Sequence, residues 1–143
     1  MTSKVHYQGK LRTEAEHLRS GETILTDAPT DNHGLGQTFS PTDLVATALA
    51  SCMLTVMGIK ADSMDLDLNG MSAEVTKVMQ SGPRRIAKVE IVVHMPDRKY
   101  SKLDRALLER TARTCPVARS LSEATKQEIT FRWKQTEEPD SEE

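Results

Sequence analysis

The sequence predicts an α+β fold built around one long, buried helix, and three features point to it. Segments in which apolar and polar residues alternate lie on both sides of a long uncharged stretch. Alternation of this kind is typical of half-buried strands. The uncharged stretch begins with helix-capping residues, and two shorter helical patterns follow it. The resulting order is three strands, a helix, two strands, two helices and a strand, which favours a sheet packed against the central helix.

The N-terminal segment predicts three short strands, Lys4–Gln8, Leu11–Leu18 and Glu22–Asp27. Turns are expected at Gly9-Lys10 and Ser20-Gly21. A loop follows over residues 28–39, which contain two glycines, a proline and an asparagine. The three strands therefore lie upstream of the central helix.

The central helix is expected over residues 41–61. Ser40 can cap it, Pro41 suits the first helical position, and Asp43 lies three residues after the cap, close to a capping box. No side chain between residues 44 and 59 is charged, and apolar residues occur all around the helix, so it should be buried on all sides. A chain of 143 residues with 3% aromatics has a modest core, and we expect a second copy to provide the remaining cover.

The C-terminal half predicts two strands, two helices and a last strand, at Met71–Gln80, Arg85–Met95, Ser101–Ala112, Pro116–Ala124 and Glu128–Lys134. In the last strand, Ile129, Phe131 and Trp133 are expected to face the core. We therefore expect one domain over residues 1–135, followed by an acidic, disordered tail over residues 136–143.

Composition excludes several classes of function. The formal net charge is −2 and no cluster of basic residues occurs, which argues against nucleic acid or an anionic membrane as a partner. The uncharged segment is too short and too rich in Thr and Ser for a convincing membrane span. The four histidines lack zinc-ligand spacing, so no metal site is expected. The N-terminus has no signal pattern, which predicts a cytoplasmic protein.

The two cysteines of the chain, Cys52 and Cys115, are the candidates for redox chemistry. A permanent disulfide is disfavoured in a reducing compartment, which leaves two inert thiols or a pair that cycles. Cys52 lies within the apolar helix, where burial raises a thiol pKa, so its reactivity requires a cation from elsewhere in the fold. Cys115 precedes Pro116 and falls at a helix N-cap, where backbone N–H groups favour a thiolate. On these grounds Cys115 is the more acidic thiol, with Arg113 and Arg119 close in sequence; the alternative is a cysteine that only caps the helix.

Two further residues have ordinary explanations. Arg12 shares a strand face with Glu14 and Glu16, which predicts a solvated row of opposite charges. Asp43 is explained by helix capping.

The segments GQTFSPTDLVATALASCM (residues 36–53) and TCPV (residues 114–117) resemble the OsmC/Ohr family of peroxide-detoxifying proteins. The combination of a Ser-Pro helix start, a cysteine three turns later and a distant Cys-Pro is fairly specific. The element order is also similar over the whole chain apart from the acidic tail. The resemblance implies an OsmC-like fold that forms an intertwined homodimer with the two long helices at its centre.

The resemblance also implies roles for individual residues. Cys52 would attack a peroxide and become a sulfenic acid, and Cys115 would resolve it as a disulfide. Arg12 would hold the attacking thiolate, with Arg19 as a weaker candidate. The substrate would be an organic hydroperoxide or hydrogen peroxide, and a lipoyl-type or thioredoxin-type dithiol would regenerate the enzyme. No metal, flavin or haem is implied.

One position departs from the family pattern. Family members carry a glutamate after the helix-starting proline, where it orients the arginine, whereas this chain has Thr42 there and a carboxylate only at Asp43. One residue rotates a helical side chain by about 100°, so Asp43 would point away from Arg12 and activity would be weak. The alternatives are a non-catalytic protein that binds a small apolar or acyl ligand at the dimer interface, and a redox-responsive scaffold.

Overall fold

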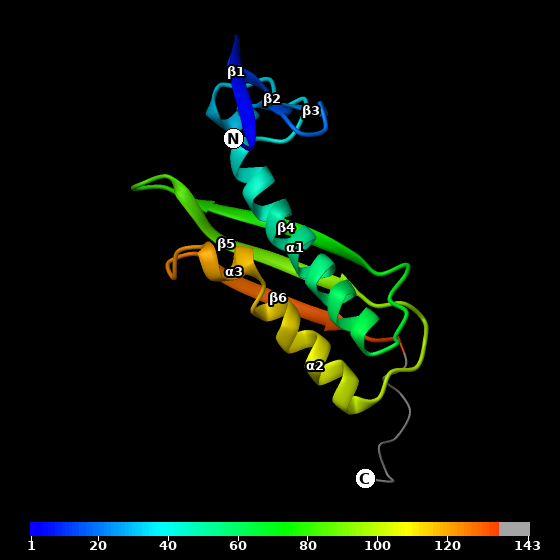
Figure 1. Ribbon diagram of the computed structural model, residues 1–143. Helices are drawn as coiled ribbons and strands as arrows, with labels where there is room; N and C mark the ends of the chain where they lie inside the picture. Colours follow the sequence, from blue (N-terminus) through cyan, green and yellow to red (C-terminus); the bar gives the residue numbers. More distant parts are fainter. Residues whose placement is uncertain (135–143) are drawn as a thin grey trace. The chain divides into compact units, whose positions relative to one another are not determined.

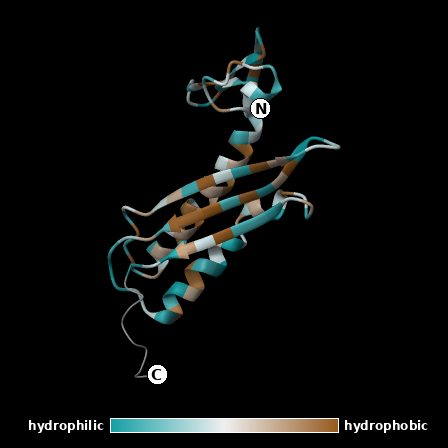
Figure 2. Cartoon of the chain, turned by 180° about the vertical axis from the view of Figure 1, so that it is seen from behind, coloured by the Kyte–Doolittle hydropathy of each residue, from teal (hydrophilic) through white to brown (hydrophobic). Residues whose placement is uncertain are grey.

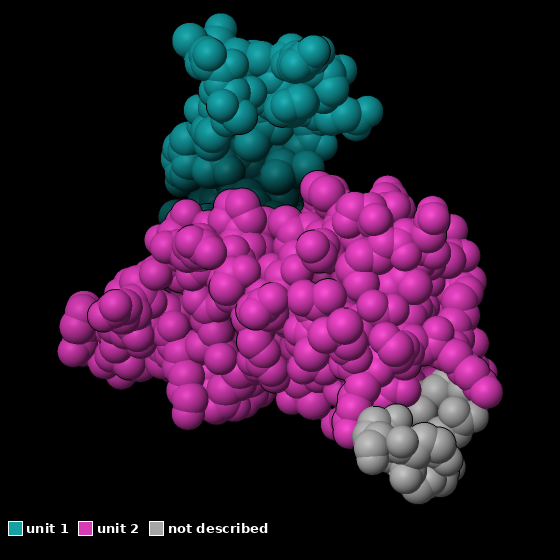
Figure 3. Space-filling model, turned by 60° about the horizontal axis from the view of Figure 1, so that its bottom comes forward, with its two compact units in different colours: residues 1–45 teal, residues 46–143 magenta. Residues whose placement is uncertain are grey.

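The computed structural model describes residues 1–134 and confirms the α+β fold and the predicted order of elements. The chain forms two compact units, residues 1–45 and the residues from 46 onward (Figure 3). The prediction of a single domain over residues 1–135 stays a prediction. The predicted disorder of residues 136–143 lies outside the described residues.

The first unit contains an antiparallel sheet of β1 (Ser3–Gly9), β2 (Arg12–His17) and β3 (Thr23–Asp27), followed by a short 3-10 turn, η1 (Thr30–Asn32). The strand predictions are correct to within one residue. Val5, Ala15 and Ile24 lie opposite one another in the register and form one face of the sheet, together with Tyr7. That apolar face is largely exposed within the chain.

The long helix α1 runs from Pro41 to Ser63, two residues beyond the predicted end. The Oγ of Ser40 accepts a hydrogen bond from the backbone N–H of Asp43 at 3.0 Å, and the Ser40 N–H donates to the Asp43 carboxylate at 2.9 Å. These two bonds form a capping box, which satisfies two N–H groups that a helix start leaves unpaired. The predicted start of the helix is confirmed.

The second unit contains a mixed sheet in the order β4 (Ser72–Gln80), β5 (Arg85–His94) and β6 (Lys126–Arg132). β4 and β5 are antiparallel, whereas β5 and β6 are parallel. The helices α1 and α2 (Lys102–Arg113) lie on one face of this sheet (Figure 1). Seen from behind, the middle strand β5 is the most hydrophobic of the three (Figure 2). Its residues Val89, Ile91 and Val93 are buried in the core.

Helix α1 is buried on one side only within the chain. The buried residues are Ala46, Leu49, Ala50, Met53, Met57 and Ala61. On the other side, Ala48, Thr55 and Ile59 are exposed, Ile59 by 66%. One chain therefore covers one side of the helix, because a single three-stranded sheet packs against one side only, and burial of the other side by a second copy stays a prediction. By length and composition alone α1 could also cross a membrane, a test that the core helix of a soluble protein passes as well.

The C-terminal elements correct two predicted boundaries. Helix α3 (Pro116–Ser120) ends four residues earlier than predicted, because Leu121 is already extended and a turn over residues 122–125 follows. Strand β6 accordingly begins at Lys126 and ends at Arg132, before Trp133. Trp133 is nevertheless buried, and its indole N–H donates to Glu109 at 2.7 Å.

Leu108 and Leu103, both on α2, provide a test of the core. Leu108 is fully buried in the core, whereas Leu103 is 69% exposed. We expect Leu108→Ala to lower the free energy of unfolding by about 2–5 kcal/mol, because it removes buried methyl groups and leaves a cavity. Leu103→Ala should change it by less than about 0.5 kcal/mol. Urea unfolding followed by Trp133 fluorescence measures both, and equal losses would contradict this description of the core.

Candidate functional site

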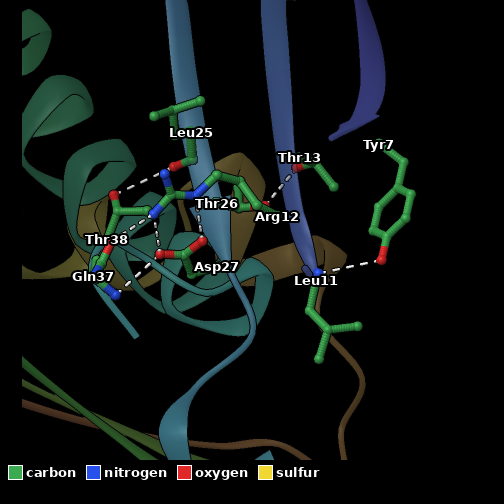
Figure 4. A network of polar contacts seen from close by, with 9 residues as sticks. All are labelled: Tyr7, Leu11, Arg12, Thr13, Leu25, Thr26, Asp27, Gln37 and Thr38. Atoms are coloured by element: carbon green, nitrogen blue, oxygen red, sulfur yellow. Dashed lines mark hydrogen bonds and ion pairs between the residues drawn. The ribbon is translucent and has the colours of Figure 1, made fainter. Parts of the chain in front are cut away.

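Arg12 and Asp27 form the central ion pair of the first unit. Arg12 opens β2 and Asp27 closes β3, and the two lie directly opposite in the register. The Arg12 Nε donates to Asp27 Oδ1 at 2.7 Å, and Nη2 donates to Oδ2 at 2.8 Å (Figure 4). This two-point geometry is the strongest way for a guanidinium to hold a carboxylate. The predicted row of Arg12, Glu14 and Glu16 is therefore wrong: Arg12 pairs across the strands, where the partner is closer.

Gln37 completes a ring of hydrogen bonds around this pair. Its backbone N–H donates to Asp27 Oδ2 at 3.0 Å, and its side-chain Oε1 accepts from Arg12 Nη2 at 2.9 Å. Asp27 is fully buried. The hydrogen bond from Arg12 is the largest influence on the Asp27 carboxyl and, helped by the Gln37 N–H, holds its pKa below the usual value despite burial. The same pairing raises the pKa of Arg12, so the pair is ionised at neutral pH.

Asp43 does not belong to the ring of hydrogen bonds around Arg12. Its carboxylate accepts the Ser40 N–H in the capping box, and its neighbour Thr42 shares a hydroxyl contact of 3.2 Å with Ser40. Asp43 therefore does not orient Arg12, because the third residue of a helix with this cap reaches back to the cap backbone. The interpretation of Asp43 as a helix-capping residue is confirmed, and the capping box agrees with the expectation that Asp43 points away from Arg12. Arg19, the weaker candidate cation, is exposed in the turn between β2 and β3.

Asp27 is the polar residue that sequence reasoning missed. A signal for it was present, because a hairpin that turns at residues 18–21 pairs Arg12 with Asp27. The prediction compared Arg12 only with Glu14 and Glu16 of its own strand, and therefore missed its partner on the neighbouring strand.

The two cysteines belong to the second unit, where the structure brings them together. Cys52 is half-buried on α1, and Cys115 is 1% exposed at the N-cap of α3, as predicted. The Cys115 sulfur accepts the Ala118 N–H at 3.4 Å. Cys52 packs against the same core cluster that contains Cys115. Both thiols are free, so the site is a dithiol pair.

The prediction that Cys115 is an acidic thiol is wrong. Burial is the largest influence and raises the pKa of Cys115, and the hydrogen bond and charge of Cys52 raise it further. The Ala118 N–H lowers this pKa but does not outweigh burial. The two nearby arginines bind backbone oxygens instead: Arg113 donates to Ile129 at 3.3 Å and Arg119 to Thr114 at 2.9 Å. In the reduced protein, Cys115 is therefore held as a neutral thiol.

A shallow cavity of about 450 Å³, wide open to solvent, lies beside the Arg12 network. It is lined by Gly36, Gln37, Thr38, Phe39 and Asp43, all from the first unit. Gln37 belongs both to this lining and to the hydrogen-bond ring of Arg12. Within residues 1–134, no group of three or more His, Cys, Asp and Glu side chains could hold a metal ion.

Residues 34–130, more than half of the chain, match the family described as OsmC-like protein. A crystal structure from Psychrobacter arcticus, of a protein named for an osmotic stress induced and detoxification response, is 50% identical. That match covers 92% of this chain and 96% of the other, with a TM-score of 0.88. No match was found among curated proteins.

More distant structures share the fold. A Legionella pneumophila protein named as an organic hydroperoxide resistance protein is 16% identical over 90% of this chain and 93% of its own, with a TM-score of 0.72. A Vibrio cholerae protein of the same designation, with captopril in one active site, is 13% identical over 92% and 91%, with a TM-score of 0.71. These two show the fold alone. By the match over residues 34–130 and the 50% identical relative, the chain belongs to the OsmC-like protein family.

Proposed function

We propose that the protein reduces organic hydroperoxides with Cys52 as the attacking thiolate, Cys115 as the resolving thiol and Arg12 as the cation that stabilises the thiolate. The observation that carries the proposal is that Cys52 packs against the core cluster that contains Cys115, close enough for Cys52 to raise the pKa of Cys115. Membership of the OsmC-like family supports it, as do the organic hydroperoxide resistance proteins that share the fold. Arg12 would come from the same chain or from a partner copy.

In the first step the Cys52 thiolate attacks the peroxide oxygen. The S–O bond forms, the O–O bond breaks, and the departing alkoxide takes a proton to leave as an alcohol. Cys52 is oxidised to a sulfenic acid, and the peroxide is reduced by two electrons. A guanidinium beside the sulfur favours the thiolate, which is the nucleophile.

In the second step Cys115 attacks the sulfenic sulfur. The disulfide forms, and hydroxide leaves and is protonated to water. Before oxidation, the hydrogen bond and charge of Cys52 raise the pKa of Cys115. An external dithiol, of lipoyl or thioredoxin type, then reduces the disulfide by thiol–disulfide exchange.

The apolar surroundings of Cys52 favour an alkyl peroxide over hydrogen peroxide. Cys52 packs at the edge of the core that contains Leu49 and Met53. Burying an alkyl chain against such residues contributes binding energy that hydrogen peroxide cannot provide.

The exposed apolar surfaces support a homodimer as the working form. One is the sheet face with Val5, Tyr7 and Ile24, and the other is the α1 side with Ile59. Exposed apolar patches of this kind mark interfaces between proteins. We propose that a second copy covers both, in a cytoplasmic homodimer without metal, flavin or haem.

Peroxide turnover tests the whole proposal. With a dithiol reductant, the wild type should consume cumene hydroperoxide faster than hydrogen peroxide. Cys52→Ser should abolish turnover, and Arg12→Ala should lower it by about 10- to 100-fold, which corresponds to about one or two units of thiol pKa. Arg132→Ala, which removes an exposed arginine from β6, should have no effect. Absence of turnover, with thiols that stay reduced, would instead favour a binding protein for a small apolar or acyl ligand.

Alkylation of the reduced protein tests whether Cys52 and Cys115 differ in exposure and in the fraction present as thiolate. At neutral pH, iodoacetamide should modify Cys52 before Cys115, because Cys115 is buried and its raised pKa leaves little thiolate. One equivalent of hydroperoxide before alkylation should protect both residues as a disulfide, and Cys115→Ser should leave a trappable sulfenic acid on Cys52. Mass spectrometry of peptides reads out each outcome. Preferential modification of Cys115 would contradict the assigned roles.

The oligomeric state tests the role of the exposed α1 side. We expect the wild type to sediment at twice the 15.9 kDa chain mass. Ile59→Glu should shift it toward the monomer, because a charge at a buried apolar interface is costly. Leu103→Glu, at an equally exposed site on α2, should sediment as the wild type does. A monomeric wild type would overturn the proposed homodimer.

A further inference from the structure

We propose that Asp27 is the positioning residue for Arg12: together with Gln37 it holds Nε and Nη2 of the guanidinium, so that Nη1 is presented to the reacting sulfur. The inference rests on the proposed function, since it assigns a task within the same site. Asp27 has no place in the sequence-based site, and it touches neither peroxide nor sulfur in this scheme. It acts through Arg12.

The first support is the hydrogen-bond pattern of Arg12. Asp27 takes Nε and one N–H of Nη2, and the Gln37 side chain accepts from Nη2 as well. These three bonds to Nε and Nη2 restrain the planar group against rotation. None of the hydrogen bonds of Arg12 within residues 1–134 uses Nη1. With 27% of its side chain exposed, Arg12 can offer the Nη1 amino group to an anion.

The second support is the setting of Asp27. All buried apolar side chains of the described chain lie at residue 46 or beyond, so the first unit has no apolar core of its own. Its fully or nearly fully buried residues are polar: Thr26, Asp27 and Ser40. A buried ion pair contributes little net stability relative to apolar residues of the same size. The Arg12–Asp27 pair is therefore better explained by the orientation it imposes than by stability.

The third support is the connection between the pair and the neighbouring loop. Gln37 binds both partners, through its backbone N–H to Asp27 and its side chain to Arg12. The same residue lines the cavity of about 450 Å³. The other nearby carboxylate, Asp43, is engaged with the helix cap. Asp27 is thus the carboxylate that holds Arg12, and through Gln37 it also places a wall of the cavity.

Removal of the Asp27 charge distinguishes positioning from simple electrostatics by the direction of the effect. If Asp27 only weakened the field of a fixed Arg12, Asp27→Asn would strengthen that field, lower the pKa of Cys52 and speed its alkylation. If Asp27 positions Arg12, the same substitution releases the guanidinium, raises the pKa of Cys52 and slows alkylation. A purely structural residue would change thermal stability and leave the pH profile of Cys52 in place.

The experiment measures the rate of Cys52 alkylation against pH in reduced full-length protein that carries Cys115→Ser, so that one thiol reacts. We expect Asp27→Asn to lower the rate at neutral pH by about tenfold, which is about one unit of thiol pKa, in the direction of Arg12→Ala. In the Arg12→Ala background Asp27→Asn should have no further effect, because it acts through Arg12. Glu16→Gln, which removes an exposed carboxylate from β2, the strand that carries Arg12, is the matched control.

Faster or unchanged alkylation in folded Asp27→Asn, beside slower alkylation in Arg12→Ala, would overturn the role of Asp27 and leave the proposed function standing. No effect of Arg12→Ala would remove Arg12 from the proposed function itself. If Asp27→Asn does not fold, Gln37→Leu replaces it, since Gln37 is exposed and its Oε1 accepts a hydrogen bond from Nη2 of the same guanidinium. An unchanged profile in Gln37→Leu would then overturn the proposal. The assay uses no peroxide, so its result is independent of turnover.

Discussion

The packing of α1 against the second sheet is the constraint on which the rest of the structure depends. Its buried side, from Ala46 to Ala61, meets Val89, Ile91 and Val93 of β5 in one continuous core. This contact fixes the rotation of the helix and so leaves Cys52 at the edge of the core cluster that contains the buried Cys115. The same rotation leaves Ile59 exposed. One packing contact therefore determines both the dithiol pair and the apolar surface available to a partner.

The first unit is organised by polar contacts instead. The side chains of Arg12 and Asp27, with the side chain and backbone N–H of Gln37, form a closed ring of hydrogen bonds. Ser40 and Asp43, which follow Gln37 in the sequence, form the capping box. Charged groups are costly to bury unless they are paired, and here each buried oxygen has a donor. A unit built in this way can hold a guanidinium firmly while its apolar sheet face remains available for an interface.

Local signals account for most of the correct predictions. Period-two alternation identified the strands, and the Ser-Pro start with Asp43 identified the capping box, because these patterns depend on neighbours in the sequence. The same reliance on neighbours produced the errors. Arg12 was read with Glu14 and Glu16 although its partner lies fifteen residues away, and Cys115 was read from its helix N-cap although burial controls its pKa.

By itself the sequence determined the α+β fold, the order of the elements, the cap of α1 and the resemblance that singled out Cys52, Cys115 and Arg12. Only the tertiary structure decided that the two cysteines lie at the same core cluster, that burial raises the pKa of Cys115, and that Asp27 rather than Asp43 holds Arg12. The physical reason is that burial and cross-strand pairing depend on which distant segments come together. A pKa or an ion pair is set by those neighbours in space, whereas periodicity and capping are set by neighbours along the chain.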